Sequence, residues 1–313
     1  MKFPRHAILF CAVLATFAVQ VVQADEVRWR VTRTKHFIIY YAGAESTAKR
    51  AGAVAEEWHA ALSRRLKFAP EGITPVYLYP DRRSFSEATG FEPGEGVVGT
   101  AHARTLRIRV DASGAFADVA HVIPHELVHV FISRRLRGYS SRLPLWMHEG
   151  LAKYLAEDWT GPDAELLADA ATSGEILPLD RISKVLPMDE RKRAVAYVQS
   201  YSAVQYMADT YGPESIPDLL SEIADGRTFG TALLYSIGVE PDRFEAEWRQ
   251  YLWEEYKLGR WVKLGMGIAS AVMSLLAILA FRARVIAKRR KAREMEEGET
   301  RRRGDAGTGR TWD

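Results

Sequence analysis

Two histidines and a glutamate in the stretch HVIPHELVHVF form the pattern H-E-x-x-H at His125, Glu126 and His129. Residues four apart lie on one face of an α-helix, so both imidazoles can face one metal ion. Glu126 follows the first histidine directly and can reach a water molecule on that ion. The pattern therefore predicts a zinc site in which a water of lowered pKa attacks a carbonyl group and Glu126 takes its proton.

A catalytic zinc needs a third protein ligand and one open position. The downstream stretch LPLWMHEGLAKYLAED reads as an amphipathic helix that begins near Glu149, twenty residues after His129. Pro144 favours a turn between the two helices, and Gly150 would let the second helix pack closely. We expect Glu149 to be the third ligand. The alternative is a solvated charge, because an acid near a helix N-terminus is favoured without any metal.

The same two stretches resemble a known family. HELVH followed by PLWMHEGLA is similar to the gluzincin metallopeptidases, and particularly to the peptidase MA-like family, which shows H-E-x-x-H and then P-x-W-x-x-E-G-x-A. Flanking segments resemble that family's N-terminal sheet and C-terminal helices, so the resemblance covers nearly all of residues 25–256. It implies that His125, His129 and Glu149 hold Zn²⁺ and that Glu126 is the base in peptide hydrolysis.

The sequence departs from this family at two positions. Pro124 precedes the motif, so the helix either begins near Val122 or is kinked there. Lys153 stands four residues after Glu149, where gluzincins often place an acid that orients a ligating histidine. A lysine cannot accept a hydrogen bond from an imidazole. The side chains that could replace that acid, besides a backbone carbonyl, are Asp118, Glu157 and Asp158.

Peptide hydrolysis also needs a hydrogen-bond donor for the developing oxyanion. The resemblance places the stretch AYVQSY over the cleft, and we take Tyr197 as the catalytic candidate, with Tyr201 as the other possibility. For either tyrosine a purely structural role in the core is the alternative. His102 and His148 are expected to be structural.

The substrate is expected to be a peptide or protein. Residues 96–103, GVVGTAHA, predict an edge strand that could pair with an extended peptide. The motif Gly-x-Met-Glu-Asn, with which related aminopeptidases bind a free substrate N-terminus, is absent. Its absence favours internal cleavage.

The order of predicted elements indicates the fold class. Strand-like segments with one helix occupy the first part of the chain, and helical patterns follow from His121 onward. This order predicts an α+β fold, with a small mixed sheet beside a helical lobe that carries the H-E-x-x-H helix, followed by one transmembrane helix.

Two apolar runs predict the topology of the chain. Residues 1–24 resemble a secretory signal peptide, with a retained N-terminal anchor as the alternative. Cleavage there would remove Cys11, the only cysteine, and leave a mature chain without disulfides. Residues 261–281 are long and apolar enough for one membrane span. The basic residues after the span place the tail, residues 282–313, in the cytoplasm, where its composition predicts disorder.

These expectations combine into one hypothesis about function. The chain is predicted to be a single-pass, membrane-anchored zinc metallopeptidase whose catalytic domain, residues 25–256, is exported to the periplasm or the extracellular side. The formal net charge of +3 is unevenly spread: the segment after Phe281 is basic, whereas the part before it is slightly acidic, so the exported part offers no basic surface for nucleic acid. The alternative is a catalytically inactive binding or assembly module, which the two departures favour. An intramembrane protease is excluded because His121, Pro124 and nearby arginines make the motif helix unsuitable as a span.

Overall fold

The computed structural model describes residues 28–91, 97–114, 118–182 and 190–306 of the chain. Side chains are described throughout these ranges except at 257–269, 287, 289–294 and 296–306. The predicted signal peptide, residues 1–24, lies outside the described residues.

A five-stranded mixed sheet forms one side of the globular part, in the order β1-β2-β3-β5-β4. The pairs β2–β3 and β3–β5 are parallel, whereas β1–β2 and β4–β5 are antiparallel. The prediction of a small mixed sheet is therefore confirmed, and β4 lies at its edge, as expected for residues 96–103. The strands are β1 (Arg30–Arg33), β2 (Phe37–Tyr41), β3 (Thr74–Tyr79), β4 (Gly99–His102) and β5 (Arg107–Asp111).

Apolar residues at every second position of the central strands build the core face of this sheet. Ile39 pairs with Val76, and Val76 pairs with Ile108, and none of these three side chains is accessible to solvent. Helices α1 (Glu45–Arg65) and α3 (Val119–Leu136) pack against each other and against the sheet. The sheet thus supports α3, the helix that carries the H-E-x-x-H motif.

The remaining helices form the second lobe, apart from α2, which follows β3 directly. This arrangement confirms the predicted α+β class, with a helical lobe after the strands. The elements are α2 (Arg82–Thr89), the 3₁₀ helix η1 (Ser140–Arg142), α4 (Leu145–Leu155), α5 (Gly161–Ser173), α6 (Leu179–Ile182), α7 (Glu190–Tyr211), α8 (Ser215–Ala224), α9 (Phe229–Ile237) and α10 (Pro241–Ala306).

The N-terminus of α3 lies more than one turn before the proline that precedes the motif. Asp118 is the N-cap, and its carboxylate accepts a hydrogen bond from the backbone N–H of Ala120 at 3.0 Å. The helix therefore begins at Val119, and the expected start near Val122 is wrong. Pro124 lies inside the helix and removes one backbone donor there, while the turn that carries the motif contains no proline.

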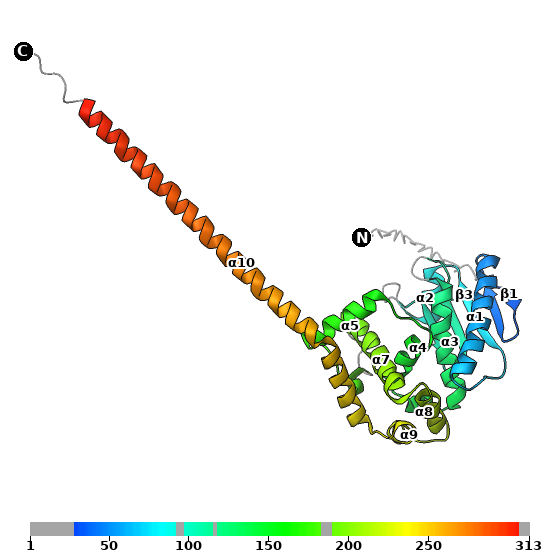
Figure 1. The fold of residues 1–313 in the computed structure, drawn as a ribbon. Helices are drawn as coiled ribbons and strands as arrows, with labels where there is room; N and C mark the ends of the chain where they lie inside the picture. Colours follow the sequence, from blue (N-terminus) through cyan, green and yellow to red (C-terminus); the bar gives the residue numbers. More distant parts are fainter. Residues whose placement is uncertain (1–27, 92–96, 115–117, 183–189, 307–313) are drawn as a thin grey trace, which may run out of the picture.

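Helix α10 leaves the globular part as a single long helix (Figure 1). Its first turns are anchored by Phe244, Trp248 and Leu252, which are almost fully buried. The expectation of a disordered tail from residue 282 onward differs from the structure, in which α10 continues to Ala306. Alanine, arginine, lysine and glutamate dominate this segment, and all four favour helix.

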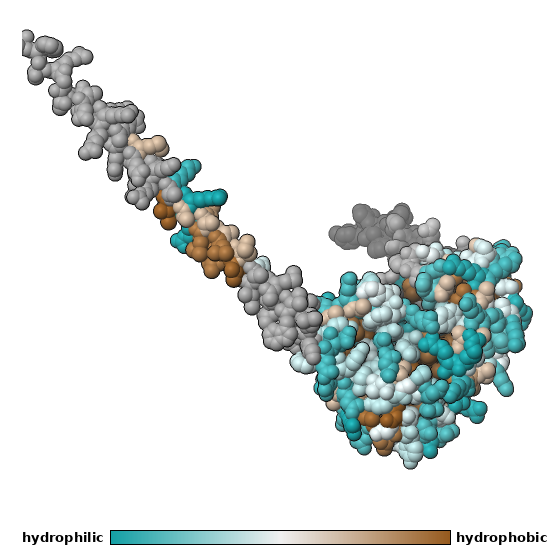
Figure 2. Space-filling model, viewed as in Figure 1, coloured by the Kyte–Doolittle hydropathy of each residue, from teal (hydrophilic) through white to brown (hydrophobic). Residues whose placement is uncertain are grey.

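Among the described residues, no helix combines the length and the apolar character that a membrane span requires. The predicted span at 261–281 falls partly on residues 257–269, whose side chains lie outside the description. Within the described portion of α10, apolar side chains from Val272 to Phe281 are 49% to 68% exposed. They form an apolar band on the projecting helix (Figure 2).

Candidate metal centre

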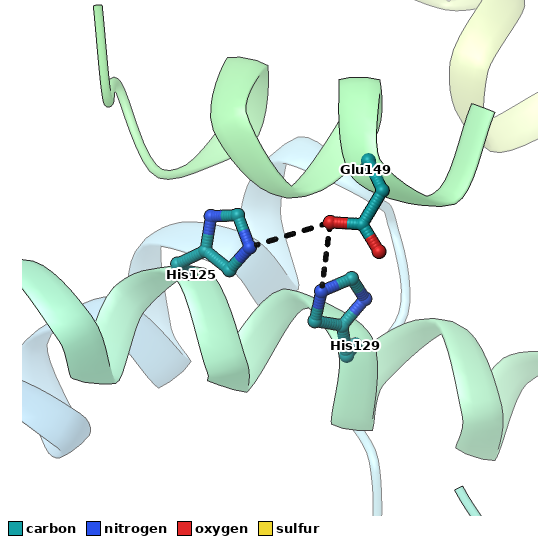
Figure 3. Close-up of side chains that lie close together, drawn as sticks. All are labelled: His125, His129 and Glu149. Carbon is teal, nitrogen blue, oxygen red and sulfur yellow. Dashed lines mark ion pairs between the residues drawn. The ribbon is translucent and has the colours of Figure 1, made fainter. Parts of the chain in front are cut away.

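Helices α3 and α4 bring three candidate ligands together (Figure 3). His125 and His129 project from one face of α3, and Glu149 reaches toward them from α4. The Oε2 atom of Glu149 lies 3.8 Å from His125 Nε2 and 3.9 Å from His129 Nε2. As the sequence suggested, α4 packs back beside α3 and places Glu149 next to both imidazoles.

The three side chains fit a single zinc ion. Their candidate ligand atoms all lie within 4.8 Å of one another. A tetrahedral ion with bonds of about 2.1 Å separates its ligands by about 3.4 Å, so only small side-chain rotations are needed. Two histidines and one glutamate also form a donor set of the catalytic type, which leaves one position open.

The electrostatic surroundings favour the metal-binding forms of His129 and Glu149. Burial lowers the pKa of His129 to about 3, so this imidazole is neutral and can donate a lone pair. Burial alone would raise the pKa of Glu149, but the neighbouring histidines hold it below its ordinary value. Burial would likewise lower the pKa of His125, yet Glu149, Glu126 and Asp158 together raise it. These carboxylates surround the site with negative charge that suits a divalent cation.

Glu126 is only 7% exposed, and burial, with a further contribution from Glu149, raises its pKa to about 7. It lies against the edge strand β4. A Cβ atom built at Gly99 would stand 2.7 Å from Glu126 Oε1 and 2.4 Å from Val122 Cγ1. Only glycine allows the edge strand to approach the carboxylate this closely. The sequence marked residues 96–103 as an edge strand but gave no sign that Gly99 would contact Glu126.

Gly150 explains how α4 can hold Glu149 in place. A Cβ atom at Gly150 would lie 2.3 Å from the backbone oxygen of Ser200 and 2.7 Å from Val204 Cγ2. Helices α4 and α7 therefore pack with their backbones in near contact at this point. The predicted close packing is confirmed, and α7 is the partner.

The two candidate tyrosines on α7 have different surroundings. Tyr197 lines an open cavity of about 270 Å³ that also includes Glu149 and Arg193. Burial, with smaller contributions from Glu149 and Glu126, raises the pKa of the Tyr197 phenol, which therefore stays protonated as a hydrogen-bond donor. The other residues that line the cavity are Leu145, Ile182, Ala196 and Ser200.

Tyr201 instead takes part in an aromatic cluster. Its ring stacks on Trp159 at a centroid distance of 4.2 Å and lies 5.9 Å from the ring of Tyr154. This packing supports the structural alternative for Tyr201. The presence of Arg193 in the cavity beside Tyr197 was not foreseen, and nothing in its sequence context indicates it.

The two histidines expected to be structural lie at different distances from the centre. The ring of His148 lies 6.0 Å from that of His129, and its Nε2 atom is 3.3 Å from the backbone oxygen of Ser140. His102 is exposed at the end of β4, and its Nδ1 atom accepts a hydrogen bond from the backbone N–H of Thr105. Neither residue belongs to the group of three candidate ligands.

Comparison with known proteins agrees with this architecture. A family model described as the Peptidase MA superfamily matches residues 60–254. The chain belongs to the Peptidase MA superfamily. The matched range contains α3, α4 and α7, the helices that carry every candidate site residue.

A relative in Bacillus subtilis (strain 168), named "Uncharacterized protein YhcO", is 26% identical over 132 residues. The similar region covers 40% of this chain and 39% of that protein. The chain thus spans about two fifths of the length of this relative, whose name assigns no activity.

Proposed function

We propose that this member of the Peptidase MA superfamily is a membrane-anchored zinc metallopeptidase that hydrolyses internal peptide bonds outside the cytoplasm. The observation that carries the proposal is the convergence of His125, His129 and Glu149 beside the buried Glu126. The first three residues would hold the zinc ion, and Glu126 would act as the base.

When bound, zinc would polarise a substrate carbonyl and acidify a water molecule. Glu126 follows His125 on α3, so its carboxylate can accept the proton of the attacking water. Tyr197 keeps its proton and lines the same cavity as Glu149, which supports a role as a donor to the oxyanion. The protonated Glu126 could then give this proton to the leaving amine, which completes the hydrolysis.

The edge strand β4 supports a peptide as the substrate. Strand β4 pairs with β5 on one side and is the last strand of the sheet on the other. An extended peptide could add to this edge through backbone hydrogen bonds, next to Glu126. Such binding needs no free terminus and is consistent with cleavage within a chain.

A proteolysis assay on the purified full chain tests the proposal. With one equivalent of zinc, we expect cleavage of an unfolded protein and of a mixed peptide library at internal bonds, identified by mass spectrometry. A chelator should abolish cleavage, and stoichiometric zinc should restore it, because the hydrolytic chemistry depends on the metal. A zinc-loaded chain that cleaves neither substrate would instead favour the inactive binding or assembly module.

The proposed anchor is α10. Its exposed apolar band and the basic residues that follow Phe281 are typical of a span with a cytoplasmic C-terminus. We therefore expect a reporter that is active only outside the cytoplasm to be inactive when fused after Asp313. The same reporter fused after Tyr256, before the apolar band, should be active.

A reporter that is active only inside the cytoplasm serves as the control and should give the opposite pattern at the two fusion points. Activity of the outside-only reporter at Asp313 would reverse the proposed topology. Activity of the inside-only reporter at both points would show that the domain is not exported.

A further inference from the structure

Lys153 is a buried cation close to the metal centre. It lies on α4 one turn after Glu149 and is 9% exposed. A buried ammonium group needs opposite charges nearby. Its Nζ atom lies 3.3 Å from Asp158 Oδ2 and 3.6 Å from Asp163 Oδ2. Gluzincins often have an acid at the position of Lys153. Here the lysine stands at that position and attracts two acids, Asp158 and Asp163, toward it.

The structure distinguishes the three acids that could assist a ligating histidine. Asp118 caps α3 and forms an ion pair with Arg50 at 2.8 Å. Glu157 accepts a hydrogen bond from Arg65 at 3.1 Å, and its side chain is largely exposed. Asp158 alone among the three has a carboxylate oxygen near the site.

Asp158 Oδ2 lies 3.9 Å from His125 Nδ1. The other ring nitrogen, Nε2, faces Glu149, so the two nitrogens of this imidazole point toward different carboxylates. A hydrogen bond would need an approach of about 1 Å, which a small rotation of an aspartate can supply. The pairing is therefore within reach without movement of either helix.

The end of α4 sets the position of Asp158. Glu157 adopts a left-handed conformation with a φ of 56°, which reverses the direction of the chain. The backbone N–H of Asp158 then donates to the carbonyl of Lys153 at 2.9 Å, and that of Glu157 donates to the carbonyl of Tyr154 at 3.3 Å. This pair of bonds is a Schellman motif. It holds Asp158 back over the last turn of the helix, beside Lys153.

We propose that Asp158 is the positioning carboxylate of His125 and that Lys153 holds Asp158 in that place. The inference rests on the proposed zinc site. A ligating histidine normally donates its second N–H to a carboxylate, which fixes the ring and strengthens the ligand. Here a lysine occupies the family's acidic position, and the acid reaches the histidine from the turn that follows the helix.

Zinc affinity of the full chain tests this role. In Asp158→Asn, competition with a chromophoric chelator should show a dissociation constant for zinc that is about 10- to 100-fold higher. Cobalt substituted at the site should also show an altered visible spectrum, because His125 loses its fixed orientation. The matched control is Glu157→Gln, which neutralises the neighbouring acid that faces Arg65 and should leave affinity and spectrum unchanged.

A rescue variant distinguishes a role of Asp158 in positioning His125 from a role in folding. Adding Lys153→Glu to Asp158→Asn places a carboxylate one turn after Glu149 and should restore much of the zinc affinity. An Asp158→Asn chain that binds zinc as tightly as the parent would overturn the inference and leave the proposed function intact. Equal losses in Asp158→Asn and Glu157→Gln, with no rescue, would mean that the turn acts only through stability. A parent chain that binds no zinc would refute both.

Discussion

Replacing Glu126 with glutamine is expected to lower the rate of peptide hydrolysis by about 10²- to 10⁴-fold, which is the usual contribution of a positioned base. Glutamine keeps the size of the side chain and its ability to form hydrogen bonds, so the contact with Gly99 should survive. It removes the carboxylate that takes the proton. Because His125, His129 and Glu149 are intact, zinc should stay bound at one ion per chain.

The measurements are steady-state hydrolysis of a fluorogenic peptide and metal analysis of the same preparation. Glu57→Gln, a change at an exposed acid on α1, is the control and should keep the parent rate. Complete loss of zinc in Glu126→Gln would indicate that Glu126 is a ligand. An unchanged rate would assign the hydrolysis to another site or to a contaminating protease.

Replacing His129 with alanine is expected to remove stoichiometric zinc and, with it, all measurable hydrolysis. Of the three candidate ligands among the described residues, His125 and Glu149 would remain, and a catalytic zinc normally has three. The imidazole is partly buried, and desolvation keeps it neutral, so in the parent chain it is ready to bind metal near neutral pH. Zinc content after dialysis against metal-free buffer is the measurement.

His121→Ala is the matched control for this variant. His121 lies on the same helix, two turns earlier, and is exposed to solvent. Its removal should leave both zinc content and hydrolysis unchanged, while circular dichroism confirms the fold of both variants. If His129→Ala keeps one zinc per chain, the ligand assignment is wrong.

The sequence was most informative where a regular repeat determines geometry. The spacing of four between His125 and His129 predicted their common helix face, and the strand-like segments in the first part of the chain predicted the small sheet. Glu149 was expected beside them because a helix of suitable length returns after Pro144. In each case the relevant distance follows from a single element or from one short connection.

Contacts that depend on several distant segments could not be predicted in this way. Arg65 reaches the carbonyl of Leu155 from ninety positions earlier in the chain, at 2.9 Å. Asp158 could not be separated from Asp118 and Glu157, because its position depends on a left-handed residue other than glycine at the end of α4. Non-glycine residues rarely adopt this conformation, so no residue type signals it in advance.

The continuous helix α10 was missed for a different reason. The composition after residue 281 suggested a solvated, disordered tail, because few side chains there can enter a core. The same residues have high helix propensity, and the folded start of α10 at Phe244 and Trp248 supplies a nucleus from which the helix can extend. Composition alone does not distinguish these two outcomes.

The close spacing of the site along α3, α4 and the turn after α4 has a consequence for how such proteins diverge. Everything proposed to hold or orient the metal lies between His125 and Asp163, whereas the edge strand β4 comes from a segment before this range and Tyr197 from a segment after it. A short stretch of gene therefore encodes all the candidate metal ligands together. The flanking stretches can acquire new substrate preferences, one substitution at a time, wherever the substitution spares the close contacts at Gly99 and Gly150.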